Sequence, residues 1–415
     1  MDPQVSVEFT PPAQTVGADD QVTAYGWKAL AGSVIGYSMD GFDMLILGFM
    51  LPVISADLAL TKTQAGSLVT WTLVGAVAGG LIFGTLSDHF GRIRVLTWTI
   101  LVFAAFTGLC AFARGYWDLV AYRIIAGLGL GGEFGIGMAL AAEAWPASKR
   151  ARVSSYVALG WQSGVLLSAL VTPMLLPVIG WRGMFMVGLL PAVVAFIVRR
   201  TLHEPEIFVR KHAAKNENSF RLLVKDGKTS RTTLGIALVC SVQNFCYYGI
   251  LIWMPSYLAK SLGFSLAKSA LWTATTVLGM VFGIWMFGQL ADRIGRKPIF
   301  IVFSIAAAAT VFLYSRVTEP TELLWVGAIM GISVNHMAGV GALLSEAYPT
   351  AARATAQNVL FNLGRAVGAP GPLVVGALAA KYSFRAAIAL LASVFLLEII
   401  ATVFLIPEFK GKELE

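Results

Sequence analysis

The fold is decided by nine residues, Gly84-Thr85-Leu86-Ser87-Asp88-His89-Phe90-Gly91-Arg92, because a second copy follows 204 residues later. The copy reads Gly288-Gln289-Leu290-Ala291-Asp292-Arg293-Ile294-Gly295-Arg296-Lys297 and keeps the spacing of both glycines, the aspartate and the arginine. A second motif, Glu143-Ala144-Trp145-Pro146 with Arg150, returns 203 residues later as Glu346-Ala347-Tyr348-Pro349 with Arg353. Two motifs at nearly one offset predict that the second half of the chain duplicates the first.

The composition indicates a membrane protein. Of the 415 residues, 57% are apolar and only 13% are charged, whereas soluble domains carry roughly 45–50% apolar and about 25% charged residues. The apolar runs are long and unbroken, which excludes the short alternating strands of a membrane β-barrel. The excess lysines and arginines, which give a net charge of +8, lie between the apolar runs. This placement is typical of membrane topology, so we expect no nucleic-acid partner.

The apolar runs predict an all-α integral membrane protein with twelve transmembrane helices in two pseudo-symmetric halves. A tail, residues 1–27, and a basic linker, residues 200–231, flank the first half, 28–199. The second half, 232–406, precedes a tail of residues 407–415. The predicted spans are 28–54, 63–87, 95–113, 117–144, 153–178, 182–199, 232–258, 267–291, 298–316, 321–346, 354–379 and 384–406.

The positive charges predict the orientation. With both tails and the linker in the cytoplasm, 21 of the 31 lysines and arginines are cytoplasmic, 8 lie on the far side and 2 lie inside spans. This distribution follows the positive-inside rule. The polar tail 1–27 lacks the basic start and apolar run of a cleavable signal, so we expect a disordered tail that is retained. The three cysteines lie in apolar segments and predict neither a disulfide nor a metal site.

The doubled loop and the two Glu-x-x-Pro-x-x-x-Arg segments resemble the major facilitator superfamily. Within that superfamily, Asp40-Gly41-Phe42-Asp43 in span 1 and Gly131-Gly132-Glu133 in span 4 resemble the metabolite:proton symporters, with the aromatic-acid and sialate groups the most similar. The resemblance implies a transporter with no cofactor, only a proton gradient, that works by alternating access. It also implies a gating role for ten residues at the cytoplasmic ends of helices: Gly84, Asp88, Gly91, Arg92, Glu143, Arg150, Asp292, Arg296, Glu346 and Arg353.

These gating candidates also have a physical basis. A carboxylate there can accept hydrogen bonds from the positive N-terminus of a neighbouring helix, and an arginine can bind carbonyls or a carboxylate of the adjacent helix. Such contacts exist only while the cytoplasmic side is shut. The alternative is that the arginines are only positive-inside anchors, but anchors need neither aspartate nor fixed glycines.

Asp40 and Asp43 are the candidates for proton coupling. Asp40 lies twelve residues after Lys28, or about 18 Å into span 1. A buried carboxylate usually faces a partner or a watery cavity, and a spacing of three puts both carboxyl groups on one helix face, within reach of each other. We expect this pair to hold a proton. The alternative is a structural ion pair with Arg123 of span 4.

Span 4 adds two further ionisable groups, Arg123 and Glu133, which we assign to the same proton-linked network. Glycines 127, 131 and 135 form a smooth stripe, which predicts close helix packing rather than a nucleotide-binding loop.

The C-terminal half lacks the acidic pair, because an offset of 204 places Asn244 and Tyr247 opposite Asp40 and Asp43. It offers amides and aromatic rings suited to orienting an organic solute. The substrate-binding candidates are Trp161, Gln162, Gln243, Asn244, Tyr247, Tyr248, Asn335, His336, Asn362 and Arg365. A lone buried histidine such as His336 is more often a neutral, hydrogen-bonded residue than a proton carrier. For Glu398 one interpretation is that it reaches the cytoplasmic water.

Arg365 lies about halfway along span 11, with no carboxylate near it in sequence. A guanidinium that cannot lose its proton requires an anion, and a carboxylate fits its two-pronged geometry. The alternatives are an ion pair with another helix, with Glu398 as a candidate, and a purely structural role.

These features predict a monomeric secondary transporter of the bacterial inner membrane that couples the movement of protons to a small organic anion, a monocarboxylate such as an aromatic or sugar acid. The partners are the solute, protons and the lipid bilayer. The rival within the class is a transporter of organic cations or zwitterions, in which Glu133 or the aspartate pair holds an amine. A receptor on the same fold would require a signalling domain, and an enzyme would require a nucleophile with a base or a metal site; the sequence predicts neither.

Overall fold

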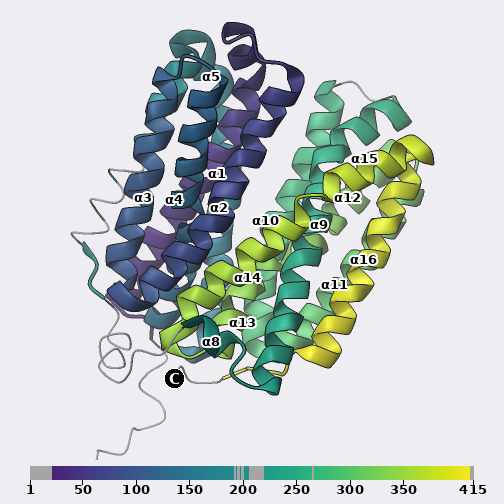
Figure 1. Ribbon diagram of the computed structural model, residues 1–415. Coiled ribbons are helices and arrows are strands. Elements are labelled where there is room, and N and C mark those ends of the chain that lie inside the picture. The colour runs from purple at the N-terminus through teal and green to yellow at the C-terminus, as the bar shows by residue number, and fades with distance from the viewer. Residues whose placement is uncertain are drawn as a thin grey trace, which may run out of the picture.

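The computed structural model describes residues 21–190, 193, 197, 201–204, 219–263 and 266–411, and its regular elements in those ranges are helices (Figure 1). The N-terminal bundle contains α1 (Ala24–Asp57), α2 (Lys62–Phe90), α3 (Arg92–Leu109), α4 (Tyr116–Ala144) and α5 (Arg150–Val187). The short α8 (Ser219–Leu223) precedes the C-terminal bundle. That bundle contains α9 (Gly227–Leu262), α10 (Leu266–Ile294), α11 (Arg296–Arg316), α12 (Pro320–Val334), α13 (Val340–Ala347), α14 (Arg353–Gly368), α15 (Gly371–Lys381) and α16 (Phe384–Leu405).

Ten helical segments within the described ranges are long and apolar enough to cross a membrane. Two of the twelve predicted spans are not among them. Span 182–199 falls partly on residues outside the described ranges, and α5 ends at Val187 within it. Span 354–379 consists of two shorter helices, α14 and α15, which meet at Ala369 and Pro370. A proline removes a backbone donor and cannot continue a helix interior without a break.

Two more helices are interrupted. The tenth predicted span, 321–346, is divided into α12, a 3₁₀ turn from His336 to Gly339, and α13. The break falls at Asn335, whose backbone angles (φ −105°, ψ 62°) are not helical. In α5 the chain bends at Gly180 (φ 65°), between the predicted fifth and sixth spans. Broken helices free backbone groups at membrane depth, which is tolerated where the break faces protein or a cavity.

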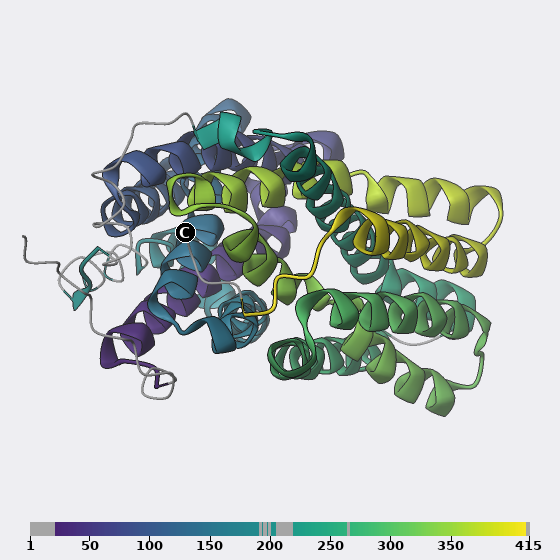
Figure 2. The same cartoon turned by 90° about the horizontal axis from the view of Figure 1, so that it is seen from below.

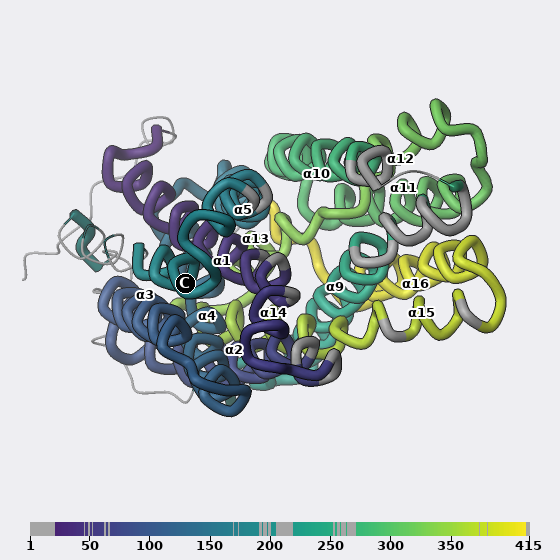
Figure 3. Tube along the Cα trace, turned by 90° about the horizontal axis from the view of Figure 1, so that it is seen from above, coloured from purple at the N-terminus to yellow at the C-terminus, as the bar shows by residue number. Residues whose placement is uncertain are grey.

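The two bundles stand side by side, and Figures 2 and 3 show them along the helix axes. Contacts between the bundles are made by α14 against α2 and α4, and by α10 against α5. Figure 2 shows α14 lying against the N-terminal bundle, although it belongs to the C-terminal one. The predicted glycine stripe of α4 is confirmed as packing, because an added Cβ would lie 2.2 Å from Thr72 O at Gly127 and 1.8 Å from Ala76 O at Gly131.

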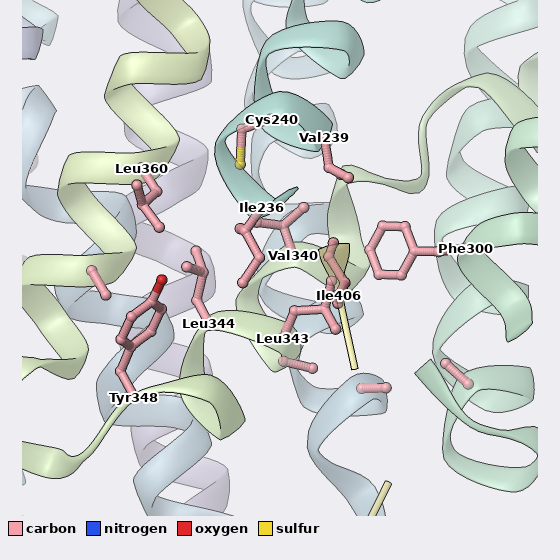
Figure 4. Close-up of a cluster of buried hydrophobic side chains, with 14 of the residues drawn as sticks. Ile236, Val239, Cys240, Phe300, Val340, Leu343, Leu344, Tyr348, Leu360 and Ile406 are labelled. Carbon is pink, nitrogen blue, oxygen red and sulfur yellow. The ribbon is translucent and has the colours of Figure 1, made fainter. Parts of the chain in front are cut away.

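Each bundle has its own apolar core. Figure 4 shows part of the C-terminal core, where side chains of α9, α11, α13 and α14 meet, among them Cys240, Phe300, Leu343 and Leu360. The three cysteines are buried and form no disulfide. Burial of such side chains contributes about 1.5–3 kcal/mol each relative to water, but within lipid the gain comes from close packing.

The connecting segments differ from the prediction in extent. The first helix begins at Ala24 rather than at residue 28. The predicted linker 200–231 contains α8 and the first turn of α9, so its later part is helical. The expectations for residues 1–20, 205–218 and 412–415 lie outside the described residues.

Candidate functional site

The repeated motifs meet at one end of the molecule, formed by residues 84–92, 143–153, 288–297 and 346–355, which we call the gate end. Arg92 is fully buried there and binds Asp88 Oδ1 at 2.6 Å and Glu143 Oε1 at 3.1 Å. Arg353 of the other half reaches the same Glu143 oxygen at 2.6 Å. Arg92 also donates to the Thr350 carbonyl across the bundles at 2.8 Å. One carboxylate therefore joins arginines from both halves.

The second copy repeats this arrangement with the halves exchanged. Arg296 binds Glu346 Oε1 at 2.8 Å and Asp292 Oδ1 at 3.3 Å. Arg150 of the N-terminal half lies 4.0 Å from Glu346. Arg296 Nη2 also donates to the Ala147 carbonyl at 3.2 Å. The contacts are thus pseudo-symmetric, although the second arginine is farther from its glutamate than in the first copy.

Both motif aspartates cap a helix of the opposite half. Asp88 accepts hydrogen bonds from the backbone N–H groups of Ala354 (3.2 Å) and Thr355 (2.8 Å), at the start of α14. Asp292 accepts from Ala151 (3.0 Å) and Arg152 (3.1 Å), at the start of α5. An anion at a helix N-terminus satisfies unpaired donors and complements the helix dipole.

The motif glycines permit these contacts. Gly91 and Gly295 adopt positive φ angles of 106° and 132°, which favour glycine. Gly84 approaches α14 so closely that a Cβ would lie 3.2 Å from Thr355 Cα. At Gly288 a Cβ would lie 3.0 Å from Arg152 Cα of α5. The glycines therefore let the two halves touch.

Two further carboxylates at the gate end are absent from the predicted site. Glu204 accepts from the backbone N–H groups of Arg92, Ile93 and Arg94, at the start of α3, at 2.7–3.2 Å. Glu408 accepts from Arg296 and Lys297, at the start of α11, at 3.0 Å each. The two glutamates are 204 residues apart, so the repeat offset is the signal that could have found them.

The span 1 aspartates do not form the expected pair. Asp43 instead binds Arg123 through two hydrogen bonds, of 3.1 and 2.7 Å, and Arg123 also donates to Thr72 at 3.0 Å. The ion pair with Arg123 that was given as the alternative is therefore present at Asp43. The reason is that a guanidinium from α4 satisfies a buried carboxylate better than a second carboxylate does.

Asp40 of α1 lies beside Glu133 of the neighbouring helix α4 and is not paired with Asp43. The two carboxyl groups are within hydrogen-bonding reach of each other, and their residues are 2% exposed. Among the described residues, no donor binds Asp40 Oδ1 or either Glu133 oxygen. Gly36 leaves room for the Glu133 head group, because a Cβ there would lie 2.2 Å from Glu133 Oε1. Two carboxyl groups can bond to each other only if one of them carries a proton.

A cavity of about 50 Å³ lies between the bundles. Its lining is mostly aromatic and amide side chains, with one guanidinium. The lining residues are Tyr37, Phe134, Ala158, Trp161, Gln243, Asn244, Tyr247, Tyr248, Ile284, Asn335, Met337, Ala338, Phe361 and Arg365. Sites for small organic molecules are typically lined in this way, by aromatic rings with a few polar groups.

Arg365 is 5% exposed and lies in the cavity wall between two aromatic rings. Its guanidinium carbon lies 4.9 Å from the centre of the Phe361 ring and 5.6 Å from that of Trp161. Its Nε has no hydrogen-bond partner among the described residues. The guanidinium also lies near enough to Asp40 to act on it electrostatically. Among the residues that the structure describes, Arg365 is thus held by ring faces and not by a carboxylate.

Seven of the ten predicted substrate residues line this cavity; the three that do not are Gln162, His336 and Asn362. Asn362 Nδ2 donates to the Gly131 carbonyl across the bundles at 2.9 Å. Gln162 Nε2 lies 3.9 Å from Met280 Sδ. Sequence reasoning missed the aromatic partners Tyr37 and Phe134, since apolar rings in a span look alike whether they face lipid or a cavity.

His336 and Glu398 form a buried pair in the C-terminal bundle. His336 Nε2 lies 2.8 Å from Glu398 Oε1, and both residues are fully buried. Gln243 Nε2 donates to both Glu398 oxygens, at 2.9 and 2.8 Å. The interpretation that Glu398 reaches the cytoplasmic water is therefore wrong, because polar partners from α9 and the 3₁₀ turn hold it inside.

The described residues include no group of three or more histidine, cysteine, aspartate or glutamate side chains that could hold a metal ion. What the geometry contains is a binding cavity between two pseudo-symmetric membrane bundles and a polar network that joins them at one end. This is the architecture of a secondary transporter.

Comparison with known proteins agrees with this class. The family model "Major Facilitator Superfamily" matches residues 33–369 and 257–414. A Haemophilus influenzae protein named "Putative metabolite transport protein" is 64% identical over 95% of this chain and 100% of its own length. The "Probable 4-methylmuconolactone transporter" of Cupriavidus pinatubonensis is 32% identical over 92% of this chain and 90% of its own.

Among solved structures, the proton:xylose symporter XylE superposes with a TM-score of 0.78 at 19% identity, over 95% of this chain and 98% of its own, which shows a shared fold. The chain belongs to the major facilitator superfamily. It is a multi-pass membrane transporter of metabolites, related to carriers of organic acids such as cis,cis-muconate and sialic acid, and not an enzyme. Transporters of this kind need no cofactor.

Proposed function

We propose that the protein is a proton-coupled symporter of a small organic monocarboxylate in the bacterial inner membrane. The observation that carries the proposal is Arg365, a buried guanidinium in the cavity wall that has no carboxylate partner in the part of the chain that the structure describes. The relationship to carriers named for organic acids supports the substrate class.

Arg365 is suited to bind the carboxylate. A buried charge without a partner is costly, and Trp161 and Phe361 compensate for only part of that cost through their ring faces. A substrate carboxylate would accept two hydrogen bonds from the guanidinium. The aromatic and amide side chains around it would select the rest of the molecule.

Asp40 and Glu133 are suited to hold the proton. They are buried together without a donor among the described residues, so ionising both would place two like charges side by side. The field of Arg365 reaches Asp40. A substrate anion on Arg365 would weaken that field and favour a proton on the Asp40–Glu133 pair. Binding of the substrate would in this way be coupled to binding of the proton. Asp43 and Arg123 would hold α1 and α4 together.

The gate end would face the cytoplasm, as the distribution of lysines and arginines predicts. Breaking the bridges from Glu143 to Arg353, and from Asp88 and Asp292 to the opposite helices, would open that side. The gating assignment rests on these contacts between the halves.

The rival proposal is a transporter of organic cations or zwitterions. The Asp40–Glu133 pair favours it as an amine site, because no other described residue donates to Asp40 Oδ1 or to the Glu133 oxygens. The sign of the substrate charge separates the two. A thermal-shift screen of purified protein against aromatic acids, sugar acids, short hydroxy acids and quaternary amines identifies the class. An anion transporter responds to acids only, and stabilisation by amines alone would contradict our proposal.

Proton coupling is tested with the acid that the screen returns. Vesicles with an inward proton gradient should accumulate it, and vesicles without a gradient should still exchange it in counterflow. The variant Glu133→Gln or Asp40→Asn should lose accumulation, and at least one of them should retain counterflow, because an amide preserves the shape but cannot cycle a proton. Full accumulation in both variants would remove this pair from the mechanism.

A further inference from the structure

We propose that the α9 wall of the cavity recognises a hydrogen-bond donor, so that the transported anion is a hydroxylated carboxylate. The inference rests on the proposed function and narrows its substrate class. The observation behind it is that two neighbouring amides on α9, Gln243 and Asn244, have their nitrogens engaged inside the protein while both side chains line the cavity.

Gln243 is oriented by Glu398. Its Nε2 donates to Oε1 and Oε2 of that carboxylate at 2.9 and 2.8 Å. A carboxylate accepts hydrogen bonds, so the amide must turn its nitrogen toward Glu398. The carbonyl oxygen is then the polar atom of the Gln243 side chain that is available to a ligand in the cavity. It accepts no hydrogen bond from the described residues.

Glu398 is in turn oriented by His336. The Ser333 carbonyl lies 2.7 Å from His336 Nδ1, and because a carbonyl only accepts, Nδ1 must carry a hydrogen. The other ring nitrogen, Nε2, faces Glu398 at 2.8 Å. A single proton between His336 Nε2 and Glu398 Oε1, carried by either atom, makes this contact a hydrogen bond. His336 and Glu398 are therefore positioning residues for Gln243, which explains a buried polar pair that does not itself line the cavity.

Asn244 is oriented by its own helix. Its Nδ2 donates to the Cys240 carbonyl at 2.8 Å. Gly368 of α14 packs so closely that a Cβ there would lie 2.4 Å from Asn244 Cβ, which limits rotation of the side chain. The Asn244 carbonyl oxygen thus joins that of Gln243 in the cavity wall.

The cavity is therefore complementary to a molecule with two different ends. Arg365 on α14 can donate hydrogen bonds to a substrate carboxylate. The two amide oxygens on the adjacent α9 can accept hydrogen bonds from a donor group of the substrate. A carboxylate without a donor group would leave both acceptors buried and unpaired, which is unfavourable. We expect a hydroxyl group on the substrate to raise affinity by roughly ten-fold to a hundred-fold.

The test uses the purified full chain and two sets of matched acids. One set is benzoate with its 3- and 4-hydroxy and 3- and 4-methoxy derivatives, and the other is butyrate with 3-hydroxybutyrate and 3-methoxybutyrate. A methoxy group keeps the oxygen but cannot donate. In at least one set the hydroxy acid should bind at least ten-fold more tightly than the methoxy acid.

The variants Gln243→Leu and Asn244→Leu should reduce this hydroxy-to-methoxy ratio, toward about one in combination. Glu398→Gln should also reduce the ratio, because it frees the Gln243 amide to turn. The matched control is Gln64→Leu, at the start of α2 outside the cavity, which should keep the parent ratio. If Gln243→Leu does not fold, Asn244→Leu and Glu398→Gln decide the question.

Equal binding of hydroxy and methoxy acids by the parent protein would overturn this inference alone, and so would an unchanged ratio in the variants. Absence of binding to every carboxylate, with binding of a quaternary amine, would overturn the proposed function and this inference with it.

Discussion

Asp88→Asn tests the gate most sharply, because the Asp88 side chain bridges the halves through the α14 N-terminus. Its two oxygens accept from Ala354 N at 3.2 Å and Thr355 N at 2.8 Å. Asparagine keeps one acceptor, and its amide group would face an N–H donor. The variant thus loses one charge-assisted hydrogen bond, about 1.5–3 kcal/mol, and a charge–dipole contribution of roughly 0.3–1 kcal/mol.

Only contacts that exist in one state shift the balance between states. The bond from Arg92 to Asp88 lies within one half, whereas the α14 contacts must break when the gate end opens. A net loss of about 2–4 kcal/mol favours the open gate by roughly thirty-fold to several hundred-fold. Substrate affinity should change by no more than the altered population of the binding-competent state.

Spin labels introduced by Arg94→Cys on α3 and Arg293→Cys on α10 report the opening as a distance between the halves. Both positions are exposed, and the three native cysteines are buried, so background labelling is low. Asp88→Asn should add a population with a longer distance. The control Asp57→Asn removes an ion pair to Arg182 within one half and should leave the distribution unchanged. An unchanged distribution in Asp88→Asn, or an equal shift in the control, would refute the reasoning.

Two further predictions concern the buried charges and the helix caps. Asp43→Asn leaves Arg123 buried without its ion pair, which should cost about 3–5 kcal/mol and lower the thermal unfolding temperature more than Asp40→Asn does; an equal or smaller decrease would contradict the structural role. Glu204→Gln removes the charge that caps α3, a loss of about 1 kcal/mol or more, so hydrogen exchange in the first turn of α3 should accelerate several-fold, and Glu408→Gln should do the same at α11. Unchanged exchange in both variants would show that the caps contribute little.

The repeat in the sequence carries most of what could be predicted about the fold. Two motifs at offsets of 204 and 203 residues predict two related halves, and charged groups within apolar runs mark the interior. The breaks at Asn335 and at Pro370 were not predicted. Pro370 is a visible signal, whereas Asn335 is not, because tertiary contacts around His336 hold that turn.

The pairing of buried charges was harder to predict. Sequence spacing places Asp40 and Asp43 on one face of a helix, but it does not say which side chains of other helices meet that face. Arg123 is 80 positions from Asp43, and His336 is 62 positions from Glu398. Lipid-facing and core-facing side chains are both apolar in a membrane span, so periodicity does not identify the cavity face.

The affinity of Arg365 variants for the acid returned by the screen tests the central claim most directly. Loss of one partner of a buried, bidentate contact costs about 2–5 kcal/mol, or roughly thirty-fold to several thousand-fold in affinity. Arg365→Ala should therefore lose nearly all binding, and Arg365→Lys, which keeps the charge but not the two-pronged geometry, should retain part of it. Glu133→Gln should bind the acid nearly as well as the parent. A folded Arg365→Ala that binds the carboxylate with parental affinity would contradict the account, as would loss of binding in Glu133→Gln alone.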